Sequence, residues 1–380
     1  RGPESSAKRN DTSSVPLEPN KPLSPWNGAQ RSDRVQNDTP KYIYDESGNK
    51  KEARNINAYL LDGENIFVES RSNPICDVPL MNFGNMPRDG GNLIIEASDY
   101  DDFIKQEPSA LKYIHPLLGA EEYLNNKKRY CLWLDGASPA EIRKMPKVYE
   151  RVCKCRDMRL ASKAASTQKM AEIPHLFAQR TQPMGVPYII VPQVTSERRR
   201  YIPIGFMSPD VIVTNLVQII PNATLYHFGI LTSNVHNAWM RAVCGRLKSD
   251  YRYSKDIVYN NFPWPSLDER RKTKDERSGV KDERGQIKSP AKGVSPEQIR
   301  VINQEKIMST AQAILDARAK YPDCSLADLY DETTMPIELR KAHQENDRAV
   351  MAAYGLKPKT SESECVAHLM ALYRELARQR

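Results

Sequence analysis

Residues 224–265 read TLYHFGILTSNVHNAWMRAVCGRLKSDYRYSKDIVYNNFPWP and change character several times along their length. The apolar run at 224–231 predicts a buried strand, whereas 233–247 predicts a helix with Ser233 as its N-cap. Prolines that alternate with aromatics at 258–265 favour a rigid extended segment packed on a domain surface. We therefore expect an α+β fold. The sequence upstream of this stretch and the sequence downstream of it predict different kinds of secondary structure.

The sequence upstream of this stretch has short apolar runs separated by turn signals, which indicates a β-rich region. Strands are expected at 41–46, at 129–136, at 211–221, and as a pair joined by the polar turn 195–198 within 187–207. Ser138 followed by Pro139 and Glu141 is a typical helix start. Pro146 breaks that helix, and a longer one is expected from about 147 to 165.

The sequence downstream predicts helices almost throughout. Segment 266–294 is charged and lacks an apolar period, so we expect an exposed insert or linker. A capping pattern at Ser295, Pro296 and Gln298 then begins a strong helix over 295–322. Its expected apolar stripe consists of Ile299, Ile302, Ile307, Ala311, Ile314 and Leu315. Further helices are expected at 325–332, 337–355 and 361–380, which makes the C-terminal region all-α.

Composition excludes several classes of protein. The chain has 380 residues, enough for two or three domains, and a mean hydropathy of −0.64. No stretch approaches the roughly 18 apolar residues of a membrane helix, so we expect no membrane partner. Seven cysteines without a CxxC pair favour free thiols in a reducing cytoplasm over a metal site.

The net charge of +8, with a pI near 9.0, favours an anionic partner, and nucleic acid is the commonest. Part of this charge lies on the predicted helix 147–165, on Lys147, Arg151, Lys154, Arg156, Arg159 and Lys163. These residues are equally compatible with a cationic binding side and with a solvated face. Stronger candidates are the arginines of SERRRY (196–201), which we expect at the start of a strand, and the basic–aromatic run at 240–255. The alternative interpretation is that the basic residues of these two segments form salt bridges on the protein surface.

Catalytic motifs are missing. None of the glycine-containing turns at 83–85, 88–92 and 134–138 matches the strand–helix turn that binds S-adenosylmethionine. The segment 258–265 resembles the Asn-Pro-Pro-aromatic turn of amino-group DNA methyltransferases, but Phe262 follows Asn261 and displaces the second hydrogen-bonding group. We predict no catalytic residue, no bound cofactor and no metal in this chain. The buried-pattern histidines and the acidic turn are expected to be structural: His227, His236, His343, His368, Asp99, Asp101 and Asp102.

Several segments together resemble one protein family. They include NINAYLLDG, RYCLWLDG, SERRRYIPIGF and, above all, the block 226–265, and they follow the family's order over roughly 41–265 and 295–380. The chain is similar to the C-terminal half of the MmeI-like bacterial DNA adenine-N6 methyltransferases, many of which are fused to a restriction nuclease. The resemblance implies a β-rich target-recognition domain with packed helices, followed by an all-α C-terminal domain. The expected division is a disordered or extended arm at 1–40, the tail of a methyltransferase domain and connector at 41–80, the target-recognition domain at 81–265, a charged linker or insert at 266–294 and the helical C-terminal domain at 295–380.

The resemblance also implies roles for individual residues. Residues expected to read DNA bases are Arg246, Lys248, Asp250, Arg252 and Ser254. Residues expected to contact phosphates are Arg198, Arg199, Arg200, Arg241 and Lys255. Lys248 and Asp250 form an i,i+2 pair that would offer one donor and one acceptor to a base pair. The implied function is double-stranded DNA recognition for a bacterial, cytoplasmic, S-adenosylmethionine-dependent parent enzyme, whose methyltransferase domain is the expected partner.

Two other hypotheses remain open from the sequence. A non-enzymatic protein could bind an acidic protein or RNA through the charged segment 266–294 and the C-terminal helices. An enzyme complete in 380 residues is the third possibility, and it would require S-adenosylmethionine binding by this chain.

Overall fold

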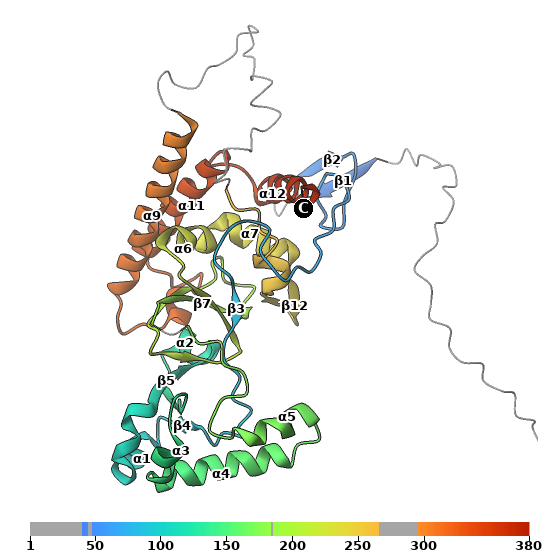
Figure 1. Ribbon diagram of the computed structural model, residues 1–380. Helices are drawn as coiled ribbons and strands as arrows, with labels where there is room; N and C mark the ends of the chain where they lie inside the picture. The colour runs from blue at the N-terminus through green and yellow to red at the C-terminus, as the bar shows by residue number, and fades with distance from the viewer. Residues whose placement is uncertain (1–39, 45–47, 184, 266–294, 380) are drawn as a thin grey trace, which may run out of the picture.

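The computed structural model describes residues 40–44, 48–183, 185–265 and 295–379. Figure 1 shows an elongated arrangement with helices at one end, a sheet in the middle and a smaller lobe at the other end. This combination confirms the expected α+β fold. A separate hairpin of β1 (Lys41–Tyr44) and β2 (Lys50–Ala53) lies beside the helical end.

The small lobe is built around a four-stranded sheet in the order β10-β5-β6-β4. Its strands are β4 (Ile94–Glu96), β5 (Ile114–Leu118), β6 (Arg129–Leu132) and β10 (Ile212–Val213). The helices packed on it are α1 (Tyr100–Gln106), α3 (Pro139–Arg143), α4 (Pro146–Leu160) and α5 (Ala165–Lys169), with 3₁₀ turns at Pro108–Tyr113 and Met170–Glu172. The lobe has its own core, in which Leu93, Ile95 and Val148 are fully buried.

The middle of the molecule contains two further sheets. One has the order β3-β11-β7-β9, and its strands are β3 (Asn82–Phe83), β7 (Tyr188–Pro192), β9 (Gly205–Met207) and β11 (Val217–Pro221). The other has the order β12-β13-β8, with β8 (Val194–Thr195), β12 (Gly245–Leu247) and β13 (Asp250–Arg252). Helix α2 (Ala120–Asn125) lies near the first sheet in Figure 1.

The helical end forms one packed unit with the centre. Its elements are α6 (Leu225–Thr232), α7 (Asn234–Val243), a π-helical turn (Lys255–Tyr259), α9 (Pro296–Ala319), α10 (Leu326–Leu329), α11 (Ile337–Ala353) and α12 (Glu362–Arg378). A single core contains Trp239 of α7, Ile307 of α9 and Leu369 of α12. The approach of α6 to α9 requires Gly229, because a Cβ there would lie 2.7 Å from Ile307 Cγ2.

Several predicted helix starts are confirmed. The Ser138, Ser233 and Ser295 side chains each accept a hydrogen bond from the backbone N–H three residues later. Pro146 is the first residue of α4, and α4 ends at Leu160, before the predicted end at 165.

Other predictions about local structure were wrong. Residues 224–231 form the helix α6 instead of a strand, because a helix buried on nearly all sides shows no helical period. The helix predicted over 233–247 ends at Val243, and 245–247 becomes β12 because it pairs with 250–252. Residues 258–265 are buried in the core and do not lie on a surface.

Three further differences concern the extent of elements. Segment 187–207 contains three strands, and the arginines follow β8 in a loop instead of starting a strand. Segment 211–221 contains two short strands. In α9, Ile307, Ala311 and Ile314 are buried, whereas Ile299 and Ile302 are exposed.

Candidate nucleic-acid interface

Strands β12 and β13 form an antiparallel hairpin that projects at the side of the molecule. Leu247 pairs with Asp250, so Lys248 and Ser249 form the two-residue turn at its tip. Lys248 has φ = +56°, in the left-handed region that residues with a Cβ rarely adopt. Both turn residues are exposed. The hairpin therefore presents a lysine at its exposed tip.

A second basic segment lies beside this hairpin. β13 also pairs with β8, opposing Tyr251 to Thr195, and residues 196–200 follow β8 immediately. The Glu197 N–H donates to Asp250 Oδ1 (3.4 Å). We call 196–200 the arginine loop, and we call this loop and the hairpin together the recognition surface. Two segments that are about fifty residues apart in sequence thus form one surface.

Strand alternation divides the predicted base-reading residues between the two faces of the hairpin. Arg246 pairs with Tyr251, and its guanidinium lies 3.8 Å from the Tyr251 ring centroid. The same guanidinium donates to the Ser249 carbonyl (2.7 Å). Asp250 and Arg252 point to the opposite face, because neighbouring side chains in a strand alternate. The tip residue Lys248 lies between the two groups.

Asp250 and Arg199 are close enough on the recognition surface for their charges to interact. Asp250 is half-buried between its neighbours, and Arg199 is half-buried whereas Arg198 and Arg200 are exposed. Burial lowers the pKa of the Arg199 guanidinium, and the negative charges of Asp250 and Asp331 oppose that shift. The Asp250 charge therefore acts on Arg199, and its carboxylate oxygens can accept further hydrogen bonds.

Arg246 also lies 3.9 Å from the Glu197 carboxylate, and three further predicted site residues make contacts within the chain. Arg241 donates to both carboxylate oxygens of Glu362 (2.7 and 2.8 Å) and to the Arg200 carbonyl (3.1 Å). Lys255 is paired with Asp256 at 2.6 Å. Ser254 is half-buried, and its carbonyl accepts from the Val258 N–H at the π-helical turn. These residues hold the recognition surface in place.

Buried hydrogen bonds attach the arginine loop to the C-terminal helices. The Tyr201 hydroxyl donates to Asp347 Oδ2 (2.7 Å), and Asp347 Oδ1 accepts from the Asn234 N–H at the start of α7 (2.7 Å). Burial raises the pKa of Asp347, while these hydrogen bonds oppose the shift. The Tyr201 ring also stacks on His343 at 4.2 Å. No sequence signal connected residues 146 positions apart, so sequence reasoning missed this contact.

Asn261 does not form a base-gripping site. Its amide nitrogen donates to the carbonyls of Glu69, Asp256 and Ile257, and its oxygen accepts from Arg71 Nε. Since the side chain is buried and fully hydrogen-bonded, its role is structural, as expected. His236 and His343 are also buried, each 2.8–2.9 Å from a tyrosine hydroxyl.

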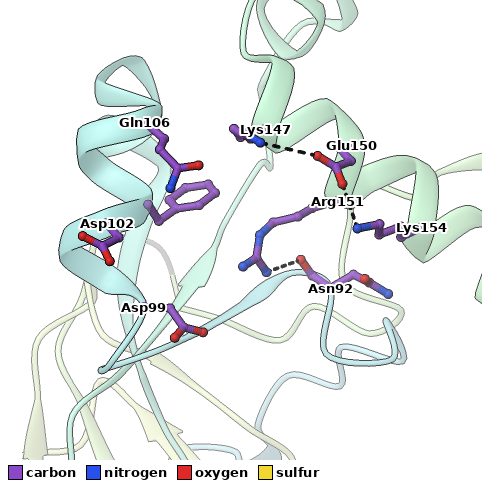
Figure 2. A pocket seen from close by; sticks show the side chains of 9 residues that line it. Asn92, Asp99, Asp102, Gln106, Lys147, Glu150, Arg151 and Lys154 are labelled. Atoms are coloured by element: carbon purple, nitrogen blue, oxygen red, sulfur yellow. Dashed lines mark hydrogen bonds and ion pairs between the residues drawn. The ribbon is translucent and has the colours of Figure 1, made fainter.

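A cavity of about 460 Å³ lies between α1 and α4 in the small lobe (Figure 2). Both lysines of its lining are engaged, because Glu150 contacts Lys147 (4.0 Å) and Lys154 (2.8 Å). Arg151 is occupied by the carbonyls of Asn92 and Ile94. Asp102 is paired with Lys105, and Asp99 accepts a hydrogen bond from the Ser98 hydroxyl, so Asp99 is the lining carboxylate that has no ion pair among the described residues.

Two other kinds of site concern the described ranges, 40–44, 48–183, 185–265 and 295–379. They contain no cluster of three or more His, Cys, Asp or Glu side chains that could hold a metal ion. None of their helices has the length and apolar character needed to cross a membrane.

Comparison with known proteins identifies the family. Residues 62–266 match the family described as MmeI, target recognition domain, and residues 299–379 match MmeI, C-terminal domain. DNA methyltransferase A of Bacillus subtilis (strain 168) is 39% identical over 337 residues, which cover 88% of this chain and 34% of the relative. The type IIL restriction-modification enzyme MmeI, solved in complex with DNA, matches with a TM-score of 0.75 and 40% identity over 89% of this chain and 42% of that chain.

The chain therefore spans less than half the length of either protein. The family matches cover the small lobe, both central sheets and the C-terminal helices. This chain belongs to the MmeI family and comprises its target recognition domain followed by its C-terminal domain.

Proposed function

We propose that this chain is the sequence-specific, double-stranded DNA recognition part of a site-specific adenine-N6 DNA methyltransferase. The observation that carries the proposal is the pairing of β8 with β13, which joins the arginine loop to an exposed basic hairpin. The similar MmeI structure contains DNA, and the Bacillus relative is named a DNA methyltransferase. Both support the proposal.

The hairpin has a shape that suits the major groove of DNA. That groove admits a two-stranded β-ribbon, and its base edges present distinct donors and acceptors. Lys248 at the tip would donate to a guanine edge, and Asp250 would accept from a cytosine amino group. Arg246 and Arg252, on opposite faces, would hold neighbouring bases or phosphates.

The arginine loop would supply affinity that does not depend on sequence. Arg198, Arg199 and Arg200 lie beside the hairpin and suit phosphate contacts. Arg241 and Lys255 are bonded to carboxylates, so we now assign them a positioning role in place of the phosphate contact first expected.

The chemistry would occur in the part of the parent enzyme that this chain does not match. A methyltransferase domain carrying S-adenosylmethionine would flip the target adenine out of the duplex and methylate it. A restriction nuclease fused to the same protein and a location in the bacterial cytoplasm belong to the same proposal.

The proposal can be tested by selecting binding sites from random duplex DNA. Exchanging the pair, as Lys248→Asp with Asp250→Lys, should change the preferred base at one position, since a good contact contributes roughly 1–3 kcal/mol of discrimination. Arg199→Gln should weaken binding to all duplexes alike and lower the salt slope by about one. An unchanged site after the exchange would exclude base reading by this pair, and tighter binding to RNA than to any duplex would favour the alternative function.

A further inference from the structure

The small lobe carries a concentration of positive charge that the proposed recognition surface does not use. Between residues 143 and 169 there are nine arginines and lysines and only two acids. Of the acids, Glu150 contacts Lys147 and Lys154 at the cavity, on one side of α4. Arg143 and Lys144 precede α4, whereas Arg156, Lys163 and Lys169 lie toward α5 at its other end.

We define the α5 platform as Arg88, Arg156, Lys163 and Lys169. All four side chains are exposed, and the last three form no ion pair with another described residue. Arg88 joins the group because its guanidinium lies 3.5 Å from the Thr167 hydroxyl of α5. Four cations therefore occupy α5 and the segments that contact it.

A buried arginine holds the platform in a fixed shape. Arg159 is fully buried, and its five N–H donors bond five backbone carbonyls. These carbonyls belong to Pro87, Arg88, Met170, Ile173 and Leu176, at distances of 2.7–3.0 Å. The guanidinium thus connects the end of α4 to the segment 87–88, which carries Arg88, and to the segment 170–176, which follows Lys169. A solvated charged face does not require such support.

The position of the platform suits a long anionic partner. In Figure 1, α5 and β12 lie on the same side of the elongated molecule, whereas α1 lies at the opposite edge of the lobe. We propose that the α5 platform binds backbone phosphates of DNA outside the bases read by the hairpin, so that the chain contacts the duplex at two places. This inference rests on the proposed function, because it requires the hairpin to engage the same duplex.

The test is a salt titration of binding to a pool of random 40-base-pair duplexes, with the whole chain. The triple variant Arg156→Gln, Lys163→Gln, Lys169→Gln should reduce the log–log salt slope by about 2.7, since each phosphate contact contributes about 0.9. The matched control is Arg143→Gln, Lys144→Gln, Lys128→Gln, which removes three exposed cations of the same lobe that also form no ion pair with a described residue and lie away from α5. The control should keep the wild-type slope.

Two outcomes would overturn the inference. One is a slope for the platform variant that equals the control, and the other is a changed preferred site, which would mean that the platform reads bases. A photo-crosslinking residue at position 163 gives a second measurement, because it should link to the duplex whereas the same residue at position 105 should not. If the wild-type chain shows no site preference at all, the proposed function fails. The salt slopes then still show, as a separate result, whether the platform residues contact phosphates.

Discussion

The two cationic surfaces of this molecule are held in place differently. The arginine loop is attached through Tyr201 to the buried carboxylate of Asp347, a residue of the C-terminal helices. The α5 platform is attached through Arg159 to carbonyls of the small lobe alone. The recognition surface consequently shares the stability of the large core, whereas the platform depends on the lobe. Long-range contacts thus couple one surface to the C-terminal domain and leave the other independent.

The largest effect is expected from Arg159→Met. The change leaves five buried carbonyls without their donor, so the free energy of unfolding of the small lobe should fall by roughly 3 kcal/mol or more. Urea unfolding, with limited proteolysis of 161–176, measures this. Arg156→Met is the control on the exposed side of α4 and should change stability by less than about 0.5 kcal/mol. Equal effects of the two variants would show that Arg159 does not support the platform.

Acid should destabilise the large core, because two buried histidines are neutral in it. Burial lowers the pKa of His236 to about 3 and that of His343 well below its usual value. Between pH 6.5 and about 3 the unfolded chain binds more protons, so stability is complete above pH 6.5 and falls as the pH drops, by about 1.4 kcal/mol per pH unit for each histidine.

The measurement is the free energy of unfolding from urea curves between pH 7 and 5. In the His236→Gln variant the free energy of unfolding should fall less steeply with decreasing pH than in the wild type. The difference in slope should correspond to about one proton, whatever the stability of the variant at pH 7. Identical slopes would mean that His236 is protonated in the folded chain.

A smaller effect is expected from Tyr201→Phe. Loss of the hydroxyl removes one donor to buried Asp347, which should lower the free energy of unfolding by about 1–3 kcal/mol and loosen the arginine loop. Binding to all duplexes should weaken without a change in preferred site. Tyr149→Phe, at an exposed position of α4, is the matched control. If the Tyr201→Phe variant is destabilised but binds DNA with normal affinity, the arginine loop does not depend on the C-terminal helices. The two cationic surfaces would then not differ in this respect.

Local signals in the sequence predicted much of the fold. The caps at Ser138 and Ser295 and the stop at Gly355, whose φ is +68°, act within a few residues and can be recognised without tertiary information. Helix α6 was missed because its surroundings are apolar on nearly every side. Strand β8 has two residues, too few to show alternation.

The candidate site was predictable only in part. Its basic residues were visible as two separate runs, but their meeting depends on the pairing of Val194 with Arg252, a long-range contact. The roles of Arg241 and Arg159 were also invisible in the sequence. An arginine that bonds a distant carboxylate or several carbonyls has the same local pattern as one that faces solvent.

The left-handed backbone conformation at Lys248 limits which residues can replace this lysine, both in evolution and in redesign. Asparagine, aspartate and glycine tolerate that conformation, whereas valine, isoleucine and threonine are strongly disfavoured by their branched Cβ. Libraries that randomise position 248 should therefore recover few β-branched residues, even where a thymine methyl group would reward them. The turn conformation thus restricts the set of amino acids at position 248 that could give a new specificity.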